Sequence, residues 1–259
     1  MTFTVPFLYD DAMEKIDISK IRTLTDLNLL YEKKEVTAST NDDLKALASI
    51  KTPDRPVVLF ADKQTAGRGR QGRSFYSEGG LYMSVLFPKL DAQAAYLTHV
   101  AAVAVAEGIR EETGLPASVK WVNDIYLSER KICGILSESI TPFGARNYIV
   151  GIGINVGTPK RNIPSDIRDI IGYIDCDKNA LAARILRKLF TLTGHFDLPS
   201  LKERYTTLCF LNGKRVNVVR NDIKKPATVL GLTDELRLRV RYDDRQTEDL
   251  IAGEVRLIV

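Results

Sequence analysis

The amino-acid sequence predicts an α+β protein in which a mixed sheet flanked by helices is followed by a small β-barrel. Strand-like and helix-like patterns are mixed along the first four-fifths of the chain. The clearest helical period covers residues 92–113, where apolar residues recur at i, i+4, i+7 and i+8. From residue 212 the pattern changes to short alternating runs, which is typical of a small barrel. We therefore expect an N-terminal arm at 1–28, a catalytic-type body at 29–211 and a barrel at 212–259.

The N-terminal half contains strands that alternate with helices. Residues 1–28 show no clean period, which favours a solvated helix, a loose arm or a cover for part of the sheet. Gly114 suits the left-handed C-cap of the 92–113 helix, and Pro116 cannot continue it. We expect strands at Leu29–Val36, Pro56–Ala61 and Leu81–Phe87, and helices at Asn41–Ile50 and Ala92–Thr113.

The C-terminal half begins with strand-like runs joined by short turns. A hairpin over Ser128–Arg130 brings Lys131 back close to Asp124. We expect body strands at Ser118–Trp121, Ile125–Leu127, Lys131–Ser139 and Asn147–Ile154, and helices near Lys178–Thr193 and Ser200–Leu211. We expect barrel strands at Arg215–Val219, Ala227–Leu232, Leu236–Arg241, Thr247–Ile251 and Val255–Val259.

The composition excludes several classes of protein. The chain has 259 residues, of which 44% are hydrophobic and 27% charged, which excludes disordered, collagen-like and disulfide-framework chains. The net charge of +4 is too small to argue for nucleic-acid or membrane binding. Cys133, Cys176 and Cys209 are far apart, and His99 and His195 have no partner motif, so a zinc site or a His-dependent triad is not favoured. Without a signal peptide or a membrane-spanning run, we expect a cytoplasmic protein.

The segment 64–73 is a loop rich in glycine and arginine. It contains the pattern G-x-G-x-x-G, but a strand follows it, whereas a dinucleotide site requires a helix that begins at the glycines. We reject the dinucleotide interpretation. Lys63, Arg68, Arg70 and Arg73 remain, with no acidic residue between them. Guanidinium groups suit phosphate and carboxylate, so a small anionic ligand is favoured, and nucleic-acid phosphates are the alternative.

Three small polar residues, Ser39, Thr40 and Asn41, stand between an expected strand and an expected helix. One interpretation is an N-terminal cap, with Thr40 and Asp43 as a capping box. The other interpretation is a set of hydrogen-bonding groups for a compact polar ligand. The residues by themselves do not decide between the two.

Two further segments carry polar groups at strand ends. In Lys120–Asp124, Trp121 suits the core and Asn123 with Asp124 suits a turn, but Asp124 near Lys131 also suits Mg²⁺ coordination or general-base chemistry. The apolar run at 151–155 ends in Asn155 and in isolation predicts a buried strand with close backbone packing.

Taken in order, these segments resemble the biotin protein ligases, also called biotin–[acetyl-CoA-carboxylase] ligases. That family shows S-T-N, Q-T-x-G-R-G-R-x-G-R, K-W-P-N-D, a strand with K-x-x-G, and G-I-G-x-N, and all five have counterparts over about residues 29–156. The ending at 250–257 is similar to the family's SH3-like domain. Val122 replaces the usual Pro, and Phe75 stands where Trp is frequent. The lipoate ligases show R-R-x-x-G-G-G instead, which this sequence lacks.

The resemblance implies the class II synthetase-like catalytic fold of biotin and lipoate ligases. It implies an ATP- and Mg²⁺-dependent ligase that activates biotin as biotinyl-5'-AMP and transfers it to a lysine of a biotin carboxyl carrier domain, in acetyl-CoA carboxylase or a related enzyme. We expect the short form, without a DNA-binding domain, and a homodimer is compatible with it. The alternatives are a lipoate-type acyl ligase and a nucleic-acid-binding module.

The resemblance also implies residue roles. The biotin-binding residues are Ser39, Thr40, Asn41, Gln64, Arg68, Gly69, Arg70 and Lys131. The ATP-binding residues are Arg68, Arg70, Arg73, Trp121, Asn123, Asp124 and Asn155. Catalytic roles fall to Lys131, Arg70 and Asp124, and Asp124 is also the candidate Mg²⁺ ligand and the candidate base.

Overall fold

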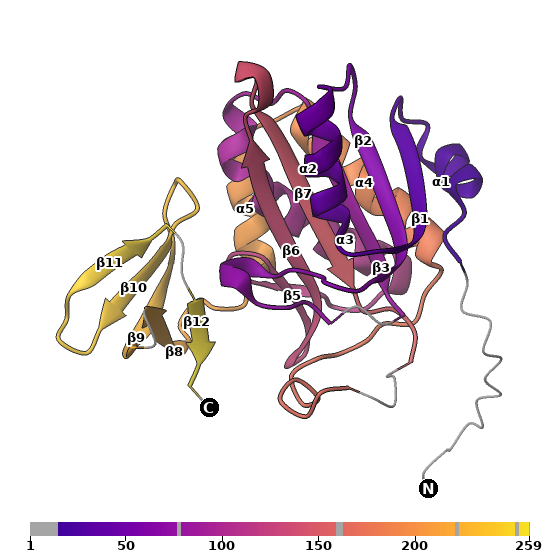
Figure 1. Cartoon of the computed structure of the whole chain (residues 1–259). Helices are drawn as coiled ribbons and strands as arrows, with labels where there is room; N and C mark the ends of the chain where they lie inside the picture. Colours follow the sequence, from indigo (N-terminus) through magenta and orange to yellow (C-terminus); the bar gives the residue numbers. More distant parts are fainter. Residues whose placement is uncertain (1–14, 77–78, 159–162, 221–222, 252–253, 259) are drawn as a thin grey trace, which may run out of the picture.

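The computed structural model describes residues 15–76, 79–158, 163–220, 223–251 and 254–258. In these residues the chain forms a seven-stranded sheet flanked by helices and a separate five-stranded sheet near the C-terminus. Figure 1 shows the second sheet beside one end of the first. No helix in the described part of the chain combines the length and apolar character needed to cross a membrane.

The larger sheet is mixed, as predicted, and its strand order is β1-β2-β3-β7-β6-β5-β4. Only the β1–β2 pair is parallel, and every other neighbouring pair is antiparallel. The strands are β1 (Leu30–Thr37), β2 (Val57–Gln64), β3 (Leu81–Phe87), β4 (Ser118–Lys120), β5 (Asp124–Leu127), β6 (Arg130–Ile140) and β7 (Asn147–Ile154). The order places β3, β7 and β6 at the centre, and every residue of β3 is buried.

Helices cover both faces of this sheet (Figure 1). The helices are α2 (Thr40–Ile50) on one face and α3 (Leu97–Thr113), α4 (Lys178–Gly194) and α5 (Leu198–Leu208) on the other. Alternate residues of β2 join separate cores: Val58 and Phe60 belong to the core with α3 and α4, and Val57 and Leu59 to the core with α2. Coverage on both faces explains why the strand is apolar without alternation.

The long helix α3 follows a short 3₁₀ turn, η2 (Ala92–Tyr96), so the predicted helix at 92–113 is present in two parts. Gly114 is its C-cap at φ 70°, and its N–H donates to Arg110 O, as predicted. A Cβ at Gly108 would lie 2.8 Å from Ile185 Cγ1 of α4, so the two helices approach closely only because this residue is glycine.

The first described residues form a helix, α1 (Ile18–Thr25), that packs on α4 and β1. Asp17 caps α1, and its own N–H donates to Asn179 Oδ1 at 2.8 Å. Ile16 and Ile21 are buried in the main core. Of the forms that we expected for residues 1–28, residues 15–28 are a packed cover rather than a loose arm. Residues 1–14 lie outside the described residues.

The packing of α1 leads to a stability prediction. Ile21→Ala removes a fully buried side chain and is expected to lower the free energy of unfolding by about 2–5 kcal/mol. Leu24 lies on the same helix with 39% of its surface exposed, so Leu24→Ala is the matched control and is expected to cost clearly less. Urea denaturation measures both. Equal losses would contradict the role of α1 as part of the core.

The smaller sheet has the strand order β11-β10-β9-β8-β12 and is antiparallel throughout. Its strands are β8 (Arg215–Arg220), β9 (Ile223–Leu232), β10 (Leu238–Tyr242), β11 (Thr247–Leu250) and β12 (Glu254–Leu257). The predicted barrel is wrong in one respect, because the sheet is not closed. The edge strands β11 and β12 have four residues each and are not paired with one another within the described residues.

The smaller sheet is attached to the body at the β4–β5 turn and at α5. Trp121 Nε1 donates to Leu236 O at 3.1 Å, and Lys202 of α5 forms an ion pair with Asp234. Figure 1 shows the sheet next to β5 and α5. One continuous core cluster contains residues of both sheets, so the C-terminal sheet shares a hydrophobic core with the body.

Candidate active site

A cavity of about 570 Å³ opens on the sheet between the Gly/Arg loop and the C-terminal sheet. The structure brings every residue to which the resemblance assigns a role to its lining, whereas Lys63 of β2 does not line the cavity. These residues are Ser39, Thr40, Asn41, Gln64, Arg68, Gly69, Arg70, Arg73, Trp121, Asn123, Asp124, Lys131 and Asn155. The lining also includes residues that we did not predict, among them Phe75, Asp166 and Arg256.

One end of the cavity is lined by buried, uncharged hydrogen-bonding groups. The backbone N–H and the hydroxyl of Thr40 both donate to Gln64 Oε1, at 2.9 and 3.1 Å. Ser84 Oγ lies 2.6 Å from Thr40 Oγ1 and 2.6 Å from Asn41 Oδ1. Thr40 and Asn41 are 4% and 3% exposed, so their orientation is set by these contacts and not by solvent. We call this the neutral end.

The capping box that we considered for this segment is wrong. Ser39 is the N-cap of α2, but no side chain caps the helix. The Thr40 hydroxyl is bound to Gln64, and the Asp43 carboxylate accepts from Thr37 Oγ1 at 2.5 Å. The cause is the parallel β1–β2 pairing, which sets Thr37 opposite Gln64 and so brings the Gln64 amide to the start of α2.

Close packing around the neutral end requires glycine in β7. A Cβ at Gly151 would lie 2.3 Å from Asn41 Oδ1, and one at Gly153 would lie 2.5 Å from the ring of Phe75. The interpretation of this strand as a buried one with close backbone approach is therefore correct. Asn155, which follows β7, donates from Nδ2 to Gly172 O at 3.0 Å, so it also holds the segment after β7 against the site.

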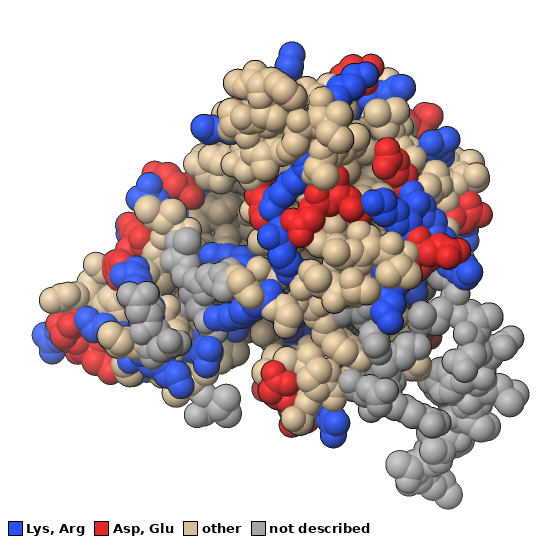
Figure 2. Space-filling view, in the orientation of Figure 1, with Lys and Arg blue, Asp and Glu red and all other residues tan. Residues whose placement is uncertain are grey.

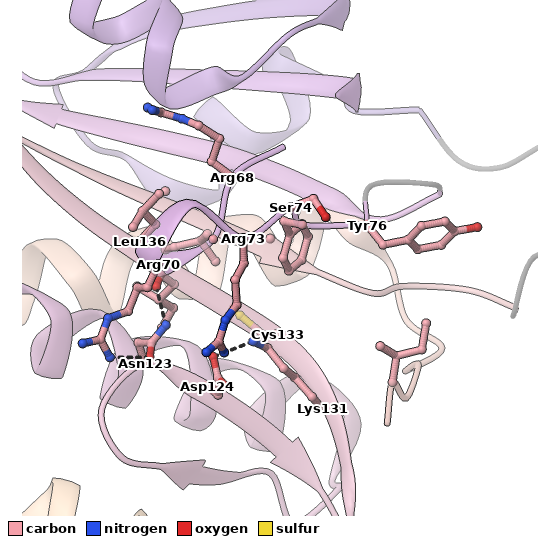
Figure 3. A pocket seen from close by; sticks show the side chains of 18 of the residues that line it. Arg68, Arg70, Arg73, Ser74, Tyr76, Asn123, Asp124, Lys131, Cys133 and Leu136 are labelled. Carbon is pink, nitrogen blue, oxygen red and sulfur yellow. Dashed lines mark hydrogen bonds and ion pairs between the residues drawn. The ribbon is translucent and has the colours of Figure 1, made fainter. Parts of the chain in front are cut away.

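The opposite end of the cavity carries the charged groups (Figure 3). Lys131 Nζ lies 2.6 Å from Asp124 Oδ1, which confirms the proximity expected from the β5–β6 hairpin. Arg70 Nη1 donates to Asn123 Oδ1 at 3.1 Å, and Asn123 Nδ2 donates to the backbone of β6 at 2.8 Å. Figure 3 shows Arg73 extending from the loop toward the Lys131–Asp124 pair. We call this the cationic end.

Basic side chains are also visible from outside at this end. In the space-filling view, Lys and Arg side chains gather between the C-terminal sheet and the body (Figure 2). Lys120 and Arg256 join the lining here, the second from β12. The cationic end therefore receives side chains from the loop, from the β4–β5–β6 region and from the C-terminal sheet, and suits a ligand with several negative charges.

Tyr126 and Cys133, which also line the cavity, are held neutral. Burial, together with the charge of Asp124, raises the pKa of Tyr126 to about 12. Burial also raises the pKa of the Cys133 thiol, so it does not supply a thiolate. Outside the cavity, burial lowers the pKa of His99 to about 4, and its ring packs on Tyr205. His99 is thus a packed core histidine.

The Gly/Arg loop has its own backbone structure. Gly69 N–H donates to Arg73 O at 2.7 Å, and Phe75 N–H donates to Gly67 O at 2.8 Å. A 3₁₀ turn, η1 (Arg70–Gly72), lies inside the segment that these two bonds close, and the next strand along the chain is β3. No α-helix begins at the glycines, which agrees with the rejection of a dinucleotide site. Phe75, where the ligase pattern often has Trp, packs over Gly134 and Gly153.

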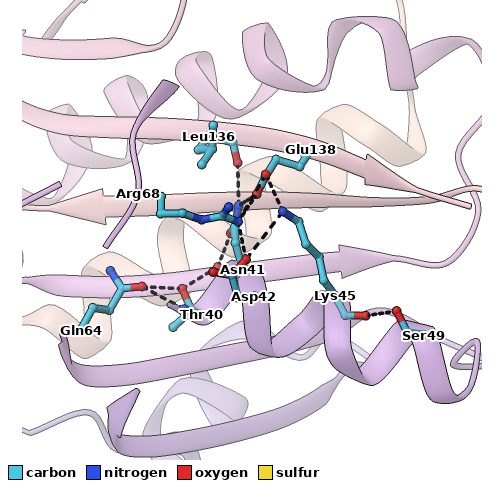
Figure 4. A network of polar contacts seen from close by, with 10 residues as sticks. Thr40, Asn41, Asp42, Lys45, Ser49, Gln64, Arg68, Leu136 and Glu138 are labelled. Carbon is cyan, nitrogen blue, oxygen red and sulfur yellow. Dashed lines mark hydrogen bonds and ion pairs between the residues drawn. The ribbon is translucent and has the colours of Figure 1, made fainter. Parts of the chain in front are cut away.

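The arginines of the loop point to different ends of the cavity. Arg70 and Arg73 reach the cationic end, whereas Arg68 reaches Asp42 of α2 and Glu138 of β6 (Figures 3 and 4). Sequence reasoning missed both of these carboxylates and also Ser84. Ser84 had a usable signal, because it is the polar residue of an otherwise apolar strand. Asp42 and Glu138 had none.

The comparisons agree with this site. The chain matches the model of the biotin/lipoate A/B protein ligase family over residues 34–155. It is 40% identical over 148 residues to the bifunctional ligase/repressor BirA of Bacillus subtilis, an alignment that spans 55% of this chain but only 45% of that relative. It is 33% identical over 194 residues to the biotin–[acetyl-CoA-carboxylase] ligase of Mycobacterium tuberculosis, which covers 70% of this chain and 71% of that one.

A solved structure is similar over almost its whole length. The biotin protein ligase of Aquifex aeolicus, determined in complex with biotin and ATP, superposes with a TM-score of 0.71 at 30% identity and covers 89% of this chain and 98% of that one. The fold and the site define an α+β ligase domain of this type. The chain belongs to the biotin/lipoate A/B protein ligase family, and within it to the biotin protein ligases.

Proposed function

We propose that this protein is an ATP-dependent ligase that joins biotin to a lysine of a biotin carboxyl carrier domain. The observation that carries the proposal is the two-ended cavity. Its neutral end offers fixed donors and acceptors for the uncharged ureido ring of biotin, through Ser39, Thr40, Asn41 and Gln64. Its cationic end suits the biotin carboxylate and the phosphates of ATP.

The chemistry of the first step explains the cationic end. A carboxylate oxygen of biotin attacks the α-phosphorus of ATP, and pyrophosphate leaves, so two anions must approach one another. Lys131, Arg70 and Arg73 offset that repulsion, and they stabilise the charge that develops on phosphorus. The product, biotinyl-5'-AMP, hydrolyses in water, so the loop must also exclude solvent.

Mg²⁺ is part of the proposal, with few ligands from the protein. Among the described residues no group of three or more His, Cys, Asp or Glu side chains converges on one point. Asp124 lines the cavity beside Lys131, and one such carboxylate suits Mg²⁺ because this ion usually takes one or two carboxylates and completes its shell with phosphates and water. When bound, the ion would neutralise phosphate charge.

In the second step a lysine amine of the carrier domain attacks the acyl carbon, and AMP leaves. At pH 7 only about one lysine amine in 2,500 is neutral, so a group that takes the proton is needed. We assign this role to Asp124, the carboxylate at the cationic end that Lys131 contacts. Trp121, Asn123 and Asn155 serve the ATP side.

The base assignment leads to a prediction about Asp124→Asn. Transfer of biotin from preformed biotinyl-5'-AMP to the carrier domain is expected to slow by about 10²–10⁴-fold, the usual contribution of a general base. Single-turnover transfer, measured separately from adenylate formation, gives the result. Loss of adenylate formation with normal transfer would contradict the base role and favour a metal-binding role for Asp124.

A second prediction concerns the loop at residues 66–73. Trypsin is expected to cleave at Arg68 and Arg70 in the free protein and much more slowly once biotinyl-5'-AMP is bound. The reason is that bound phosphate neutralises the repulsion between Arg70 and Arg73, which both line the cavity, and so holds the glycine-rich backbone closed. Cleavage at a surface residue such as Arg146 serves as the internal control. Equal cleavage at Arg68 and Arg70 with and without ligand would contradict the closing loop.

The direct test is transfer of labelled biotin to a purified biotin carboxyl carrier domain with ATP and Mg²⁺. Labelling of the acceptor, and none after its target lysine is replaced by Arg, is the expected result. Lipoate in place of biotin separates the lipoate-type alternative. Absence of transfer from either acid would contradict the proposal.

The proposal also covers the acceptor protein, the cellular compartment, DNA binding and the oligomeric state. The acceptor is the carrier domain of acetyl-CoA carboxylase or of a related biotin enzyme, and the reaction takes place in the cytoplasm. No role is assigned to DNA, because Arg70 and Arg73 line the cavity and Arg68 is paired with acids. Filter binding at physiological salt tests the nucleic-acid alternative. A homodimer is compatible with the open edge at β1, and sedimentation tests it.

A further inference from the structure

Arg68 occupies a separate place from the other loop arginines. Its guanidinium forms ion pairs with Asp42, on the first turn of α2, and with Glu138 Oε2 at 3.4 Å (Figure 4). Lys45 shares the same two carboxylates, at 3.7 Å from Asp42 Oδ1 and 2.5 Å from Glu138 Oε1. Figure 2 shows basic and acidic side chains side by side over this face. The two carboxylates, which Lys45 also contacts, hold the Arg68 guanidinium between α2 and β6.

Glu138 also contacts the neutral end of the cavity. Asn41 Nδ2 donates to Glu138 Oε2 at 2.8 Å, and Asn41 Oδ1 lies 2.6 Å from Ser84 Oγ. Polar contacts therefore run without a break from Gln64 through Thr40, Ser84 and Asn41 to Glu138 and Arg68. Burial raises the pKa of Glu138, but hydrogen bonds from Lys45 and Asn41 outweigh it and hold the pKa below its ordinary value, so the carboxylate stays charged.

We propose that Asp42 and Glu138 are positioning residues that anchor the Gly/Arg loop through Arg68 at the neutral end of the cavity. Arg68 thus fixes the loop instead of contacting phosphate. The inference rests on the proposed function where it concerns the adenylate, and on the geometry alone where it concerns the loop.

An anchor at Arg68 restrains the whole loop, because backbone hydrogen bonds connect its two arms. The bonds Gly69 N–H to Arg73 O and Phe75 N–H to Gly67 O tie its two arms together. Arg68 holds it at α2 and β6, and Arg70 holds it at Asn123 on the other side of the cavity. Loss of either contact leaves the loop fixed on one side only, so we expect it to open more often.

Hydrogen exchange of the loop amides tests the anchor without any ligand. Asp42→Asn is the cleanest variant, because Asp42 contacts only Arg68 and Lys45 among the ion pairs of the described residues and is 46% exposed. The matched control is Asp43→Asn, the next residue of α2, whose carboxylate faces Lys34 and Thr37 instead. Glu138→Gln, Arg68→Gln, the pairwise double variants and the triple variant complete the set.

The expected result is faster exchange at the amides of Gly69 and Phe75, by about two- to fivefold for each lost carboxylate, a modest effect because the pairs are partly exposed. Release of preformed biotinyl-5'-AMP is expected to accelerate most in the variants whose loop amides exchange fastest. The KM for ATP and the melting temperature are expected to stay unchanged. Arg68→Gln is expected to add nothing in the Asp42→Asn, Glu138→Gln background.

Three results would overturn the inference. The first is unchanged loop exchange in Asp42→Asn and Glu138→Gln. The second is an effect of Arg68→Gln that is equally large in the wild-type protein and in the Asp42→Asn, Glu138→Gln double variant. The third is a higher KM for ATP in Arg68→Gln with unchanged loop exchange, which would make Arg68 a phosphate ligand. Because the exchange measurement needs no substrate, it decides the anchor even if the wild-type protein forms no adenylate.

Discussion

Replacing Lys131 with methionine is expected to slow biotin-dependent adenylate formation by about 10²–10³-fold, the usual cost of removing one group that stabilises developing charge. Lys131 is the cation that the β5–β6 hairpin brings to the cationic end, 2.6 Å from Asp124. Methionine keeps the length of the side chain but leaves the Asp124 carboxylate, 23% exposed, without this partner and facing two further anions. The expected loss is therefore in kcat more than in the KM for biotin.

The matched control is Lys188→Met on α4. Lys188 is also an ion-paired lysine, with its side chain 18% exposed, but neither it nor its partners Glu107 and Glu111 of α3 line the cavity. This variant is expected to keep full adenylation activity. Steady-state formation of biotinyl-5'-AMP measures both variants. Equal activity of the two would show that Lys131 has no part in the first step.

Arg70→Gly is expected to release biotinyl-5'-AMP about 10- to 100-fold faster than the wild type. The range corresponds to the loss of a charge-assisted hydrogen bond, worth about 1.5–3 kcal/mol. Arg70 joins the loop to Asn123 at 3.1 Å and lines the cavity, so its loss removes both a tether and a cation. Free adenylate acylates any accessible amine, and we therefore expect biotin on bystander proteins.

The assay for Arg70→Gly combines the release rate of labelled adenylate with biotinylation of an added bystander such as albumin. Arg245→Gly is the control, because Arg245 lies in a turn at φ 67°, a conformation that glycine adopts without strain, and it is remote from the cavity. The control is expected to label the carrier domain alone. Strict acceptor-only labelling by Arg70→Gly would contradict the role of the loop in retention.

Local chemistry made much of the cationic end predictable. The turn at 128–130 is short enough to place Lys131 beside Asp124 whatever the rest of the sheet does. Gly114 was predictable for the same reason, since the cap depends on its own helix. The arginine-glycine segment was predicted to bind an anionic ligand because no acidic residue lies between its basic residues, and the strand that follows argued against a dinucleotide site.

Features that depend on long-range register were not predictable from local patterns, and the shared placement of Thr40 and Gln64 was expected only from the family resemblance. The neutral end requires Gln64 from β2 to meet Thr40 of α2, and this depends on a parallel pairing that no local pattern specifies. The contacts that hold Arg68 require α2 and β6 to lie together. These elements are distant in the sequence, since Asn41 of α2 and Glu138 of β6 are 97 positions apart. The open C-terminal sheet was misjudged because five short strands give the same pattern whether or not their edges pair.

The most direct measurement of the central claim is ATP–pyrophosphate exchange with Mg²⁺, using the full chain, with biotin as substrate and lipoate as control. The account predicts exchange that depends on biotin, is absent with lipoate, and is lost in Lys131→Met but not in Lys188→Met. Absence of exchange with either acid, from protein shown to be folded, would contradict the assignment of this cavity to biotin activation.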